Sequence, residues 1–155
     1  AMLQSLGYTQ FLVEVGGELF ASGLHPEKAK PWRVAIDHPK QDVARTFIAT
    51  LPLQNQGMAS SGNYRKFRID ASGNYYVHTI NPKTGKSVKS NILSTSVLAP
   101  TTMLADAYAT ALMAMPYTKG KILIENLNEV EAMWVLAEKD SVQVMATSGF
   151  TYDLE

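Results

Sequence analysis

Asp106 and Thr110 are oxygen-bearing side chains that stand four residues apart in a segment rich in Ala, Leu and Met. Such a segment favours a helix, and side chains at this spacing share one helix face. A carboxylate and a hydroxyl placed in this way can bind one hard cation such as Mg²⁺, which takes its other ligands from water, phosphate or a backbone carbonyl. In the structural alternative, Asp106 interacts with the positive N-terminal end of the helix and Thr110 donates a hydrogen bond to a backbone carbonyl.

His78 and Glu18 are two further ionisable side chains in informative positions. His78 lies in a segment of β-strand character, where an imidazole can bind a phosphate or transfer a proton, with a structural role as the alternative. Glu18 follows Gly16 and Gly17, and glycine lets a ligand approach the backbone closely. Glu18 could therefore hydrogen-bond a ribose or an adenine edge, or it could be an exposed strand carboxylate.

Ser60, Ser61 and Gly62 combine hydroxyl groups with unobstructed backbone N–H groups. This combination is typical of a phosphate-binding nest, and we expect it in a loop over residues 58–65. The segment is not a P-loop, because no Gly-Lys-Ser/Thr follows it, and the sequence contains no G-x-G-x-x-G motif. An ordinary turn is the alternative interpretation.

The composition indicates one folded domain with few electrostatic partners. The chain has 155 residues, of which 46% are apolar and 18% charged, and its Lys and Arg balance its Asp and Glu. Nucleic acid is not an expected partner, since its binding draws on clustered cations. Cysteine is absent, which excludes disulfides, thiolate metal sites and a cysteine nucleophile. No apolar run approaches the ~20 residues that span a bilayer, so we expect a soluble chain without a transmembrane segment.

Short strands are the main elements expected to position these groups. We expect the end of a helix before Gly7 and two further helices at 103–115 and 118–127. The helix at 103–115 is expected to be capped by Thr101 or Thr102 and ended by Pro116. Strands are expected at 8–21 with an interruption at the paired glycines, and at 31–37, 43–53, 65–70, 75–80, 93–98, 132–137 and 141–146. Antiparallel hairpins with few helices indicate an α+β fold and argue against a parallel doubly wound sheet.

Four sequence blocks, taken in order, resemble the FAD:protein FMN transferases, the family once called the ApbE thiamine-biosynthesis lipoproteins. The blocks are VEVGGEL at 13–19, ASSGNYR at 59–65, HTINPKTG at 78–85 and ADAYATAL at 105–112. They are similar to the family's V-E-x-G-G-E, A-T-S-G-x-Y-R, H-I-x-D-P-x-T-G and A-D-A-x-A-T-A-L. The resemblance implies an ApbE-like fold related to the T-fold, with a largely antiparallel sheet and a few packed helices.

The resemblance also implies roles for the residues singled out above. Asp106 and Thr110 resemble the family's side-chain Mg²⁺ ligands, and Asp106 and His78 resemble its catalytic groups. The residues expected along bound FAD are His78, Gly16, Gly17, Glu18, Ser60, Ser61 and Gly62. Two positions depart from the family pattern: Ser60 replaces a threonine but keeps a hydroxyl, and Asn81 replaces an aspartate and so lacks its charge.

Family members are longer and carry an L-G-G-I-A-K-G block that this sequence lacks. We therefore expect residues 1–155 to form the C-terminal portion of an ApbE-like FAD-binding domain whose N-terminal portion is absent, and hence an incomplete domain. On the same resemblance, the full-length parent is expected to be a periplasmic lipoprotein anchored at the inner membrane.

The reaction implied by the resemblance is a Mg²⁺-dependent transfer of FMN from FAD to a Thr or Ser hydroxyl of an acceptor flavoprotein, with release of AMP. Two alternatives stay open. One is an FAD pyrophosphatase that uses water as the acceptor and yields FMN and AMP. The other is a catalytically incomplete flavin-binding fragment. A binding module unrelated to flavin would require four ordered blocks to match by coincidence.

Overall fold

The computed structural model describes residues 2–39, 46–63, 67–69, 75–77, 79–88, 90–139 and 141–155. Its largest element is a six-stranded sheet in which every neighbouring pair is antiparallel. In spatial order, the strands are β1 (Phe11–Val15), β2 (Glu18–Ser22), β5 (Gln56–Gly62), β10 (Ile92–Ala99), β11 (Glu131–Glu138) and β12 (Ser141–Ala146).

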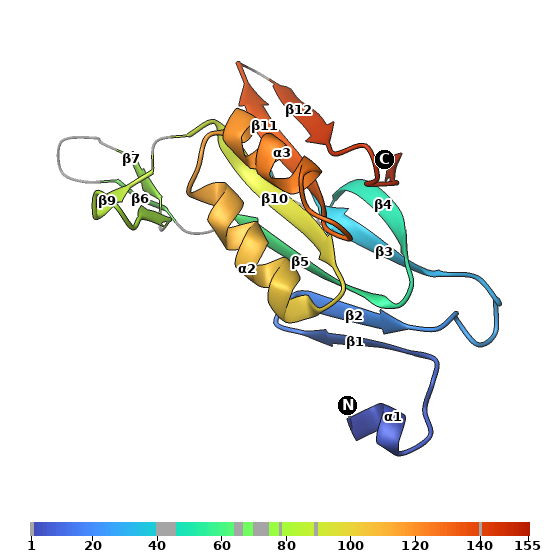
Figure 1. Cartoon of the computed structure of the whole chain (residues 1–155). Coiled ribbons are helices and arrows are strands. Elements are labelled where there is room, and N and C mark those ends of the chain that lie inside the picture. Colours follow the sequence, from blue (N-terminus) through green and yellow to red (C-terminus); the bar gives the residue numbers. More distant parts are fainter. Residues whose placement is uncertain are drawn as a thin grey trace.

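Three smaller antiparallel sheets accompany it. The three-stranded sheet has the order β13 (Asp153–Leu154), β4 (Phe47–Leu53) and β3 (Trp32–Asp37). The two hairpins are β6 (Phe67–Ile69) with β7 (Tyr75–Val77), and β8 (Ile80–Asn81) with β9 (Lys86–Ser87). Both hairpins lie to one side of the large sheet, near the end of β10 at which that strand begins (Figure 1).

The helices are α1 (Met2–Ser5), α2 (Thr102–Met113) and α3 (Tyr117–Glu125). α2 begins at Thr102 because the side chain of Thr101 caps it, accepting a 3.2 Å hydrogen bond from the backbone N–H of Leu104. Both α2 and α3 lie across the same face of the large sheet (Figure 1). Within the part of the chain that the structure describes, no helix is long and apolar enough to cross a membrane.

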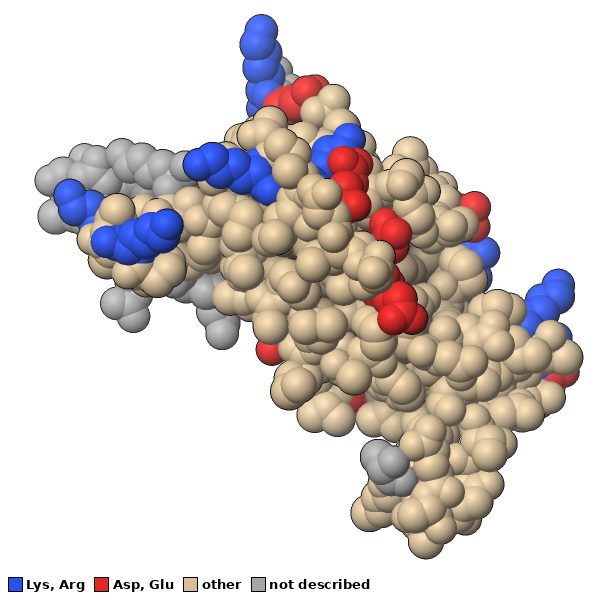
Figure 2. Space-filling view, viewed as in Figure 1, with Lys and Arg blue, Asp and Glu red and all other residues tan. Residues whose placement is uncertain are grey.

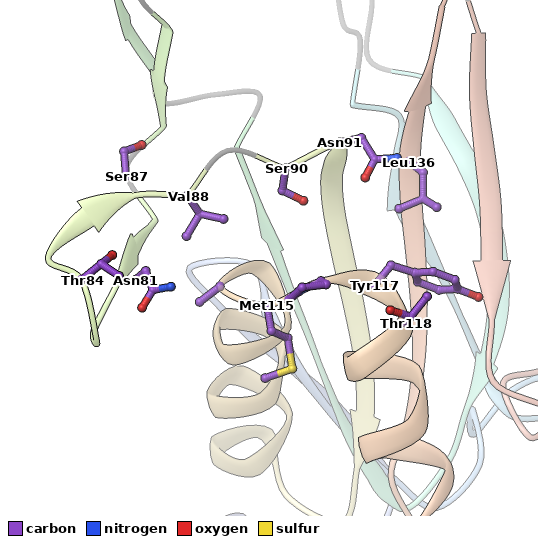
Figure 3. A pocket seen from close by; sticks show the side chains of 12 residues that line it. Asn81, Thr84, Ser87, Val88, Ser90, Asn91, Met115, Tyr117, Thr118 and Leu136 are labelled. Carbon is purple, nitrogen blue, oxygen red and sulfur yellow. The ribbon is translucent and has the colours of Figure 1, made fainter.

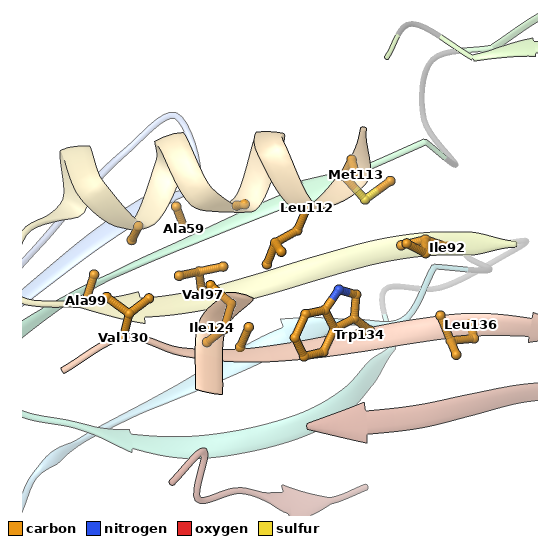
Figure 4. Close-up of a cluster of buried hydrophobic side chains, with 13 residues drawn as sticks. Ala59, Ile92, Val97, Ala99, Leu112, Met113, Ile124, Val130, Trp134 and Leu136 are labelled. Carbon is orange, nitrogen blue, oxygen red and sulfur yellow. The ribbon is translucent and has the colours of Figure 1, made fainter. Parts of the chain in front are cut away.

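Alternation along the strands of the large sheet divides the core into two layers. Val97 and Trp134 point to the helix face, where they pack with residues of α2 and α3 such as Leu112 (Figure 4). Their neighbours Leu98 and Met133 point to the other face and pack against β3 and β4. The sheet is therefore covered by helices on one face and by a smaller sheet on the other, which confirms the predicted α+β fold.

The predicted element positions are mostly confirmed. The strands expected at 31–37, 93–98, 132–137 and 141–146 correspond to β3, β10, β11 and β12, and the two longer helices to α2 and α3. The hairpin expected over 65–80 is formed by β6 and β7, with its turn outside the described residues. The strand expected over 43–53 starts as β4 at Phe47, and residues 43–45 lie outside the described part.

Two predictions about glycine-rich segments are wrong. Residues 8–21 form two strands, β1 and β2, because Gly16 and Gly17 both adopt positive φ (69° and 107°) and make the two-residue turn of a hairpin. Residues 58–62 form a strand and not a loop, since they belong to β5 and pair with β10. The strand also approaches α2 closely at Gly57, where a Cβ would lie 2.3 Å from the backbone nitrogen of Thr102.

Candidate functional site

Two hydroxyl groups hold α2 on the six-stranded sheet. Thr102, at the start of the helix, donates a 2.9 Å hydrogen bond to the carbonyl oxygen of Leu19 in β2. Thr95 of β10 is fully buried and donates a 2.8 Å hydrogen bond to the carbonyl oxygen of Ala109. Because β2 and β10 flank β5, these bonds fix the position of α2 along β5.

Thr110 contacts the end of β5 at Ser61. The two hydroxyl oxygens lie 3.2 Å apart and share a hydrogen bond. Asp106 precedes Thr110 by one turn on the same helix, and both residues are exposed. The structure therefore places the carboxylate and the hydroxyl on one helix, as expected, and adds a third oxygen beside Thr110 that the spacing argument did not include.

A cavity of about 730 Å³ lies between the large sheet and β3. It contains most of the residues predicted to lie along FAD: Gly16, Gly17, Ser60, Ser61 and Gly62. The turn between β1 and β2 and the end of β5 thus border one space. Because Ser61 both borders the cavity and bonds to Thr110, it connects this space to α2.

The floor of this cavity carries a row of serine hydroxyls. Ser60 and Ser96 share a hydrogen bond with 2.7 Å between their oxygens. Ser94 is 5% exposed, and its hydroxyl has no hydrogen-bond partner among the described residues. Glu14, Asp37 and Arg33 are the charged residues of the lining, so the wall offers hydroxyls and carboxylates but little positive charge for a phosphate.

Arg33 is engaged elsewhere. Its guanidinium donates a short hydrogen bond to the hydroxyl of Thr50 and pairs with the exposed carboxylates of Asp153, at 3.1 Å, and Glu155, at 3.8 Å. Exposed ion pairs contribute little to stability. The network nevertheless partly neutralises the guanidinium of Arg33, so the cavity lining offers a phosphate little positive charge.

Glu18 does not line the cavity. It is half-buried at the start of β2, and its Oε2 lies 3.0 Å from the position that a Cβ on Gly16 would occupy. The carboxylate therefore folds back over the turn. The expectation that Glu18 lies along bound FAD together with Gly16 and Gly17 stays a prediction.

His78 lies outside the described residues, and its predicted role is untested. The described part of its block, 79–85, contacts β5 through Thr79, whose hydroxyl donates a 2.9 Å hydrogen bond to Oδ1 of the buried Asn63. Asn81 accepts a 2.9 Å hydrogen bond at Oδ1 from the backbone N–H of Lys83. The predicted turn at 81–85 is confirmed, since it joins β8 and β9.

A second cavity, of about 650 Å³, lies between this turn and the junction of α2 and α3. Figure 3 shows Asn81 and Thr84 on one side of it, and Met115, Tyr117 and Thr118 on the other. Asn81, one of the two positions that depart from the block pattern described above, is part of this lining.

Residues 60–63 at the end of β5 are the point at which the four sequence blocks meet. Block 13–19 borders the same cavity, block 78–85 bonds to Asn63, and block 105–112 bonds to Ser61. Segments far apart in the sequence are thereby brought to one corner of the sheet.

Among the described side chains at this corner, Asp106, Thr110 and Ser61 offer oxygen atoms, which are the ligands that a hard cation requires. Asp106 supplies a carboxylate, and Thr110 and Ser61 supply hydroxyls. Among the described residues, no group of three or more His, Cys, Asp or Glu could hold a metal ion. These described side chains thus fit a partial site for a hard cation that takes its remaining oxygen ligands from elsewhere.

The sequence patterns did not point to Thr95 and Ser94, and they pointed to Thr102 only as a possible helix cap. The available signal was the Ser-Thr-Ser run at 94–96, whose alternation sends Thr95 to the helix face and its two neighbours to the cavity face.

The surface charge agrees with the composition. On the face shown in Figure 2, Lys and Arg side chains are scattered and form no continuous basic area.

The sequence of this chain is similar to those of known proteins. The sequence profile of the ApbE family matches residues 1–134. A FAD:protein FMN transferase from Haemophilus influenzae is 39% identical over 126 residues, covering 81% of this chain and 36% of that protein. A second, from Vibrio cholerae, is 33% identical over 148 residues, covering 96% of this chain and 43% of that protein.

The fold of this chain is similar to those of solved structures. The flavin transferase ApbE from Vibrio cholerae superposes with a TM-score of 0.77 at 32% identity, covering 96% of this chain and 46% of that one. The apo form of the Pseudomonas stutzeri flavinyl transferase ApbE also gives 0.77, at 33% identity, covering 95% and 44%. The chain spans less than half the length of each of these relatives. Because the family profile matches most of its residues, the chain belongs to the ApbE family.

Proposed function

We propose that this chain carries part of the site of a Mg²⁺-dependent flavin transferase, which moves FMN from FAD to a Thr or Ser hydroxyl of a target protein and releases AMP. The observation that supports this most strongly is the meeting of all four blocks at residues 60–63. The relatives named FAD:protein FMN transferase support the same reaction. That residues 1–155 are the C-terminal portion of a larger domain, and that the parent is a periplasmic lipoprotein, stay predictions.

Asp106 and Thr110 are the side chains that would hold Mg²⁺. One carboxylate and one hydroxyl leave most positions of an octahedral ion open for phosphate, water or backbone oxygens. The bound ion would neutralise the negative charge that develops on the pyrophosphate oxygens of FAD. Both residues are exposed, so a ligand can reach them.

The transfer step forms one bond and breaks another. The acceptor hydroxyl oxygen attacks the phosphorus on the riboflavin side, the bond from that phosphorus to the bridging oxygen breaks, and AMP leaves. The proton of the acceptor hydroxyl must move to a base. Asp106 and His78 are the two groups in the sequence blocks that can accept it.

The cavity bordered by Gly16, Gly17 and Ser60 would receive an uncharged part of the dinucleotide. Its serine hydroxyls and apolar side chains suit a ring or polyol better than a phosphate. Ser61, which borders the cavity and bonds to Thr110, would lie where the two parts of the ligand join.

The test is incubation of the chain with FAD, Mg²⁺ and a peptide that contains an acceptor threonine. The proposal predicts that the peptide gains the mass of FMN and that AMP appears in equal amount. Asp106→Ala should abolish both products, while the matched change Glu125→Ala on the exposed face of α3 should leave them unchanged.

The alternatives give different products. AMP and FMN without a labelled peptide would indicate a pyrophosphatase. FAD binding without turnover, measured by fluorescence quenching, would indicate a flavin-binding fragment. Absence of FAD binding, with or without the rest of an ApbE domain, would contradict the proposal.

A further inference from the structure

We propose that Ser61 is a positioning residue that orients the hydroxyl of Thr110 toward the bound divalent cation. This inference rests on the proposed function, because it assumes that Thr110 is a ligand. It gives Ser61 a role that differs from the FAD contact expected from sequence. The two oxygens share a hydrogen bond 3.2 Å long.

A threonine hydroxyl has one proton and two lone pairs. To bind a cation it must turn a lone pair toward the ion, so its proton must point to another acceptor. Ser61 Oγ is the hydrogen-bond partner of Thr110 that the structure provides. By accepting this proton, Ser61 selects the rotation of the hydroxyl in which a lone pair is free for the ion.

Both partners stand on elements that are fixed by other contacts. Ser61 lies in β5, which is an interior strand paired with β2 and β10, and it pairs directly with Thr95. Thr95 in turn donates its hydroxyl proton to the carbonyl oxygen of Ala109, the residue before Thr110. The relative position of the two hydroxyls is therefore set by the backbone before any ion binds.

Ser141 provides a control outside the proposed site. It is exposed at the start of β12, the edge strand of the large sheet on the side away from β1. A change of Ser141 to alanine removes the same atom from a strand that does not line the cavity. The two serines thus separate an effect on Thr110 from the general effect of losing a serine hydroxyl.

The experiment measures Mn²⁺ binding to the purified chain by the loss of the free-ion EPR signal, with no turnover involved. Ser61→Ala should weaken Mn²⁺ binding about 10-fold, in the range found for groups that orient metal ligands. Ser61→Thr, which keeps a hydroxyl, should restore binding, and Ser141→Ala should bind as the unchanged chain does. Thermal melting of each variant checks that the fold is intact.

A double variant shows whether Ser61 acts by positioning Thr110 or by contacting the ion itself. If Ser61 acts through Thr110, Ser61→Ala combined with Thr110→Ala should bind Mn²⁺ no more weakly than Thr110→Ala alone. Additive losses of Mn²⁺ binding in the double variant would overturn the proposal. Normal Mn²⁺ binding by Ser61→Ala, together with weakened binding by Asp106→Ala, would overturn it as well. In both cases the metal site itself would stand. Absence of Mn²⁺ binding by the unchanged chain, or normal binding by Asp106→Ala, would overturn the metal site and the role of Ser61 together.

Discussion

Gly57 of β5 lies directly beneath Thr102, the first residue of α2: a Cβ on Gly57 would be 2.3 Å from the Thr102 backbone nitrogen. The strand and the helix are therefore in contact through their backbones at this point. The same helix carries Asp106 and Thr110 further along β5, so this contact determines how closely the candidate ligands approach the strand.

Gly57→Ala is expected to destabilise the protein because the added methyl group has no space. Overpacking of this kind costs about 3 kcal/mol, which for a chain of this size lowers Tm by about 6 to 12 °C. Differential scanning calorimetry measures the shift. Gly85→Ala is the control, since no atom lies within 4 Å of its Cβ position and only its φ of 65° is unfavourable. Equal shifts for the two variants would show that α2 does not press on β5.

Thr147→Val is expected to lower the free energy of unfolding by about 2 kcal/mol, since it leaves a buried N–H group unpaired. Thr147 is 4% exposed, accepts a 3.0 Å hydrogen bond from the backbone N–H of Ala132, and donates to the carboxylate of Glu131. Urea denaturation gives the value. The same substitution at the exposed Thr151 should have no effect, and similar values at both positions would be inconsistent with this bond network.

Asp106→Asn is expected to separate activity from stability. The residue is exposed on α2, so its replacement should change the free energy of unfolding by less than about 0.5 kcal/mol. Loss of the carboxylate should lower the Mg²⁺-dependent release of AMP from FAD by about 10- to 100-fold. Glu125→Gln, which removes an exposed carboxylate that pairs with Lys121 at 3.7 Å, is the control. A large fall in stability would instead indicate that Asp106 has a structural role.

Local patterns predicted those parts of the fold that depend on neighbours in the sequence. The apolar and polar alternation of β3 and the Thr101 cap of α2 are local signals, and both elements were found where expected. Residues 58–62 form a strand and not the predicted loop because they pair with β10, a contact across more than 30 residues of sequence that no local pattern contains.

The candidate site also has one part that the local sequence predicts and another that depends on tertiary packing. The shared helix face of Asp106 and Thr110 follows from their spacing. The contact of Thr110 with Ser61 depends on the packing of α2 against β5, across 49 residues of sequence, and could not be predicted from either segment. The block pattern indicated that these segments belong to one site, but not which atoms touch.

The most direct test of the account is a crystal of the chain grown with FAD and Mn²⁺, with anomalous diffraction collected at the manganese edge. The account predicts a single strong anomalous peak within bonding distance of the Asp106 carboxylate and the Thr110 hydroxyl, with Ser61 Oγ hydrogen-bonded to that hydroxyl. A manganese peak that contacts neither Asp106 nor Thr110 would contradict it.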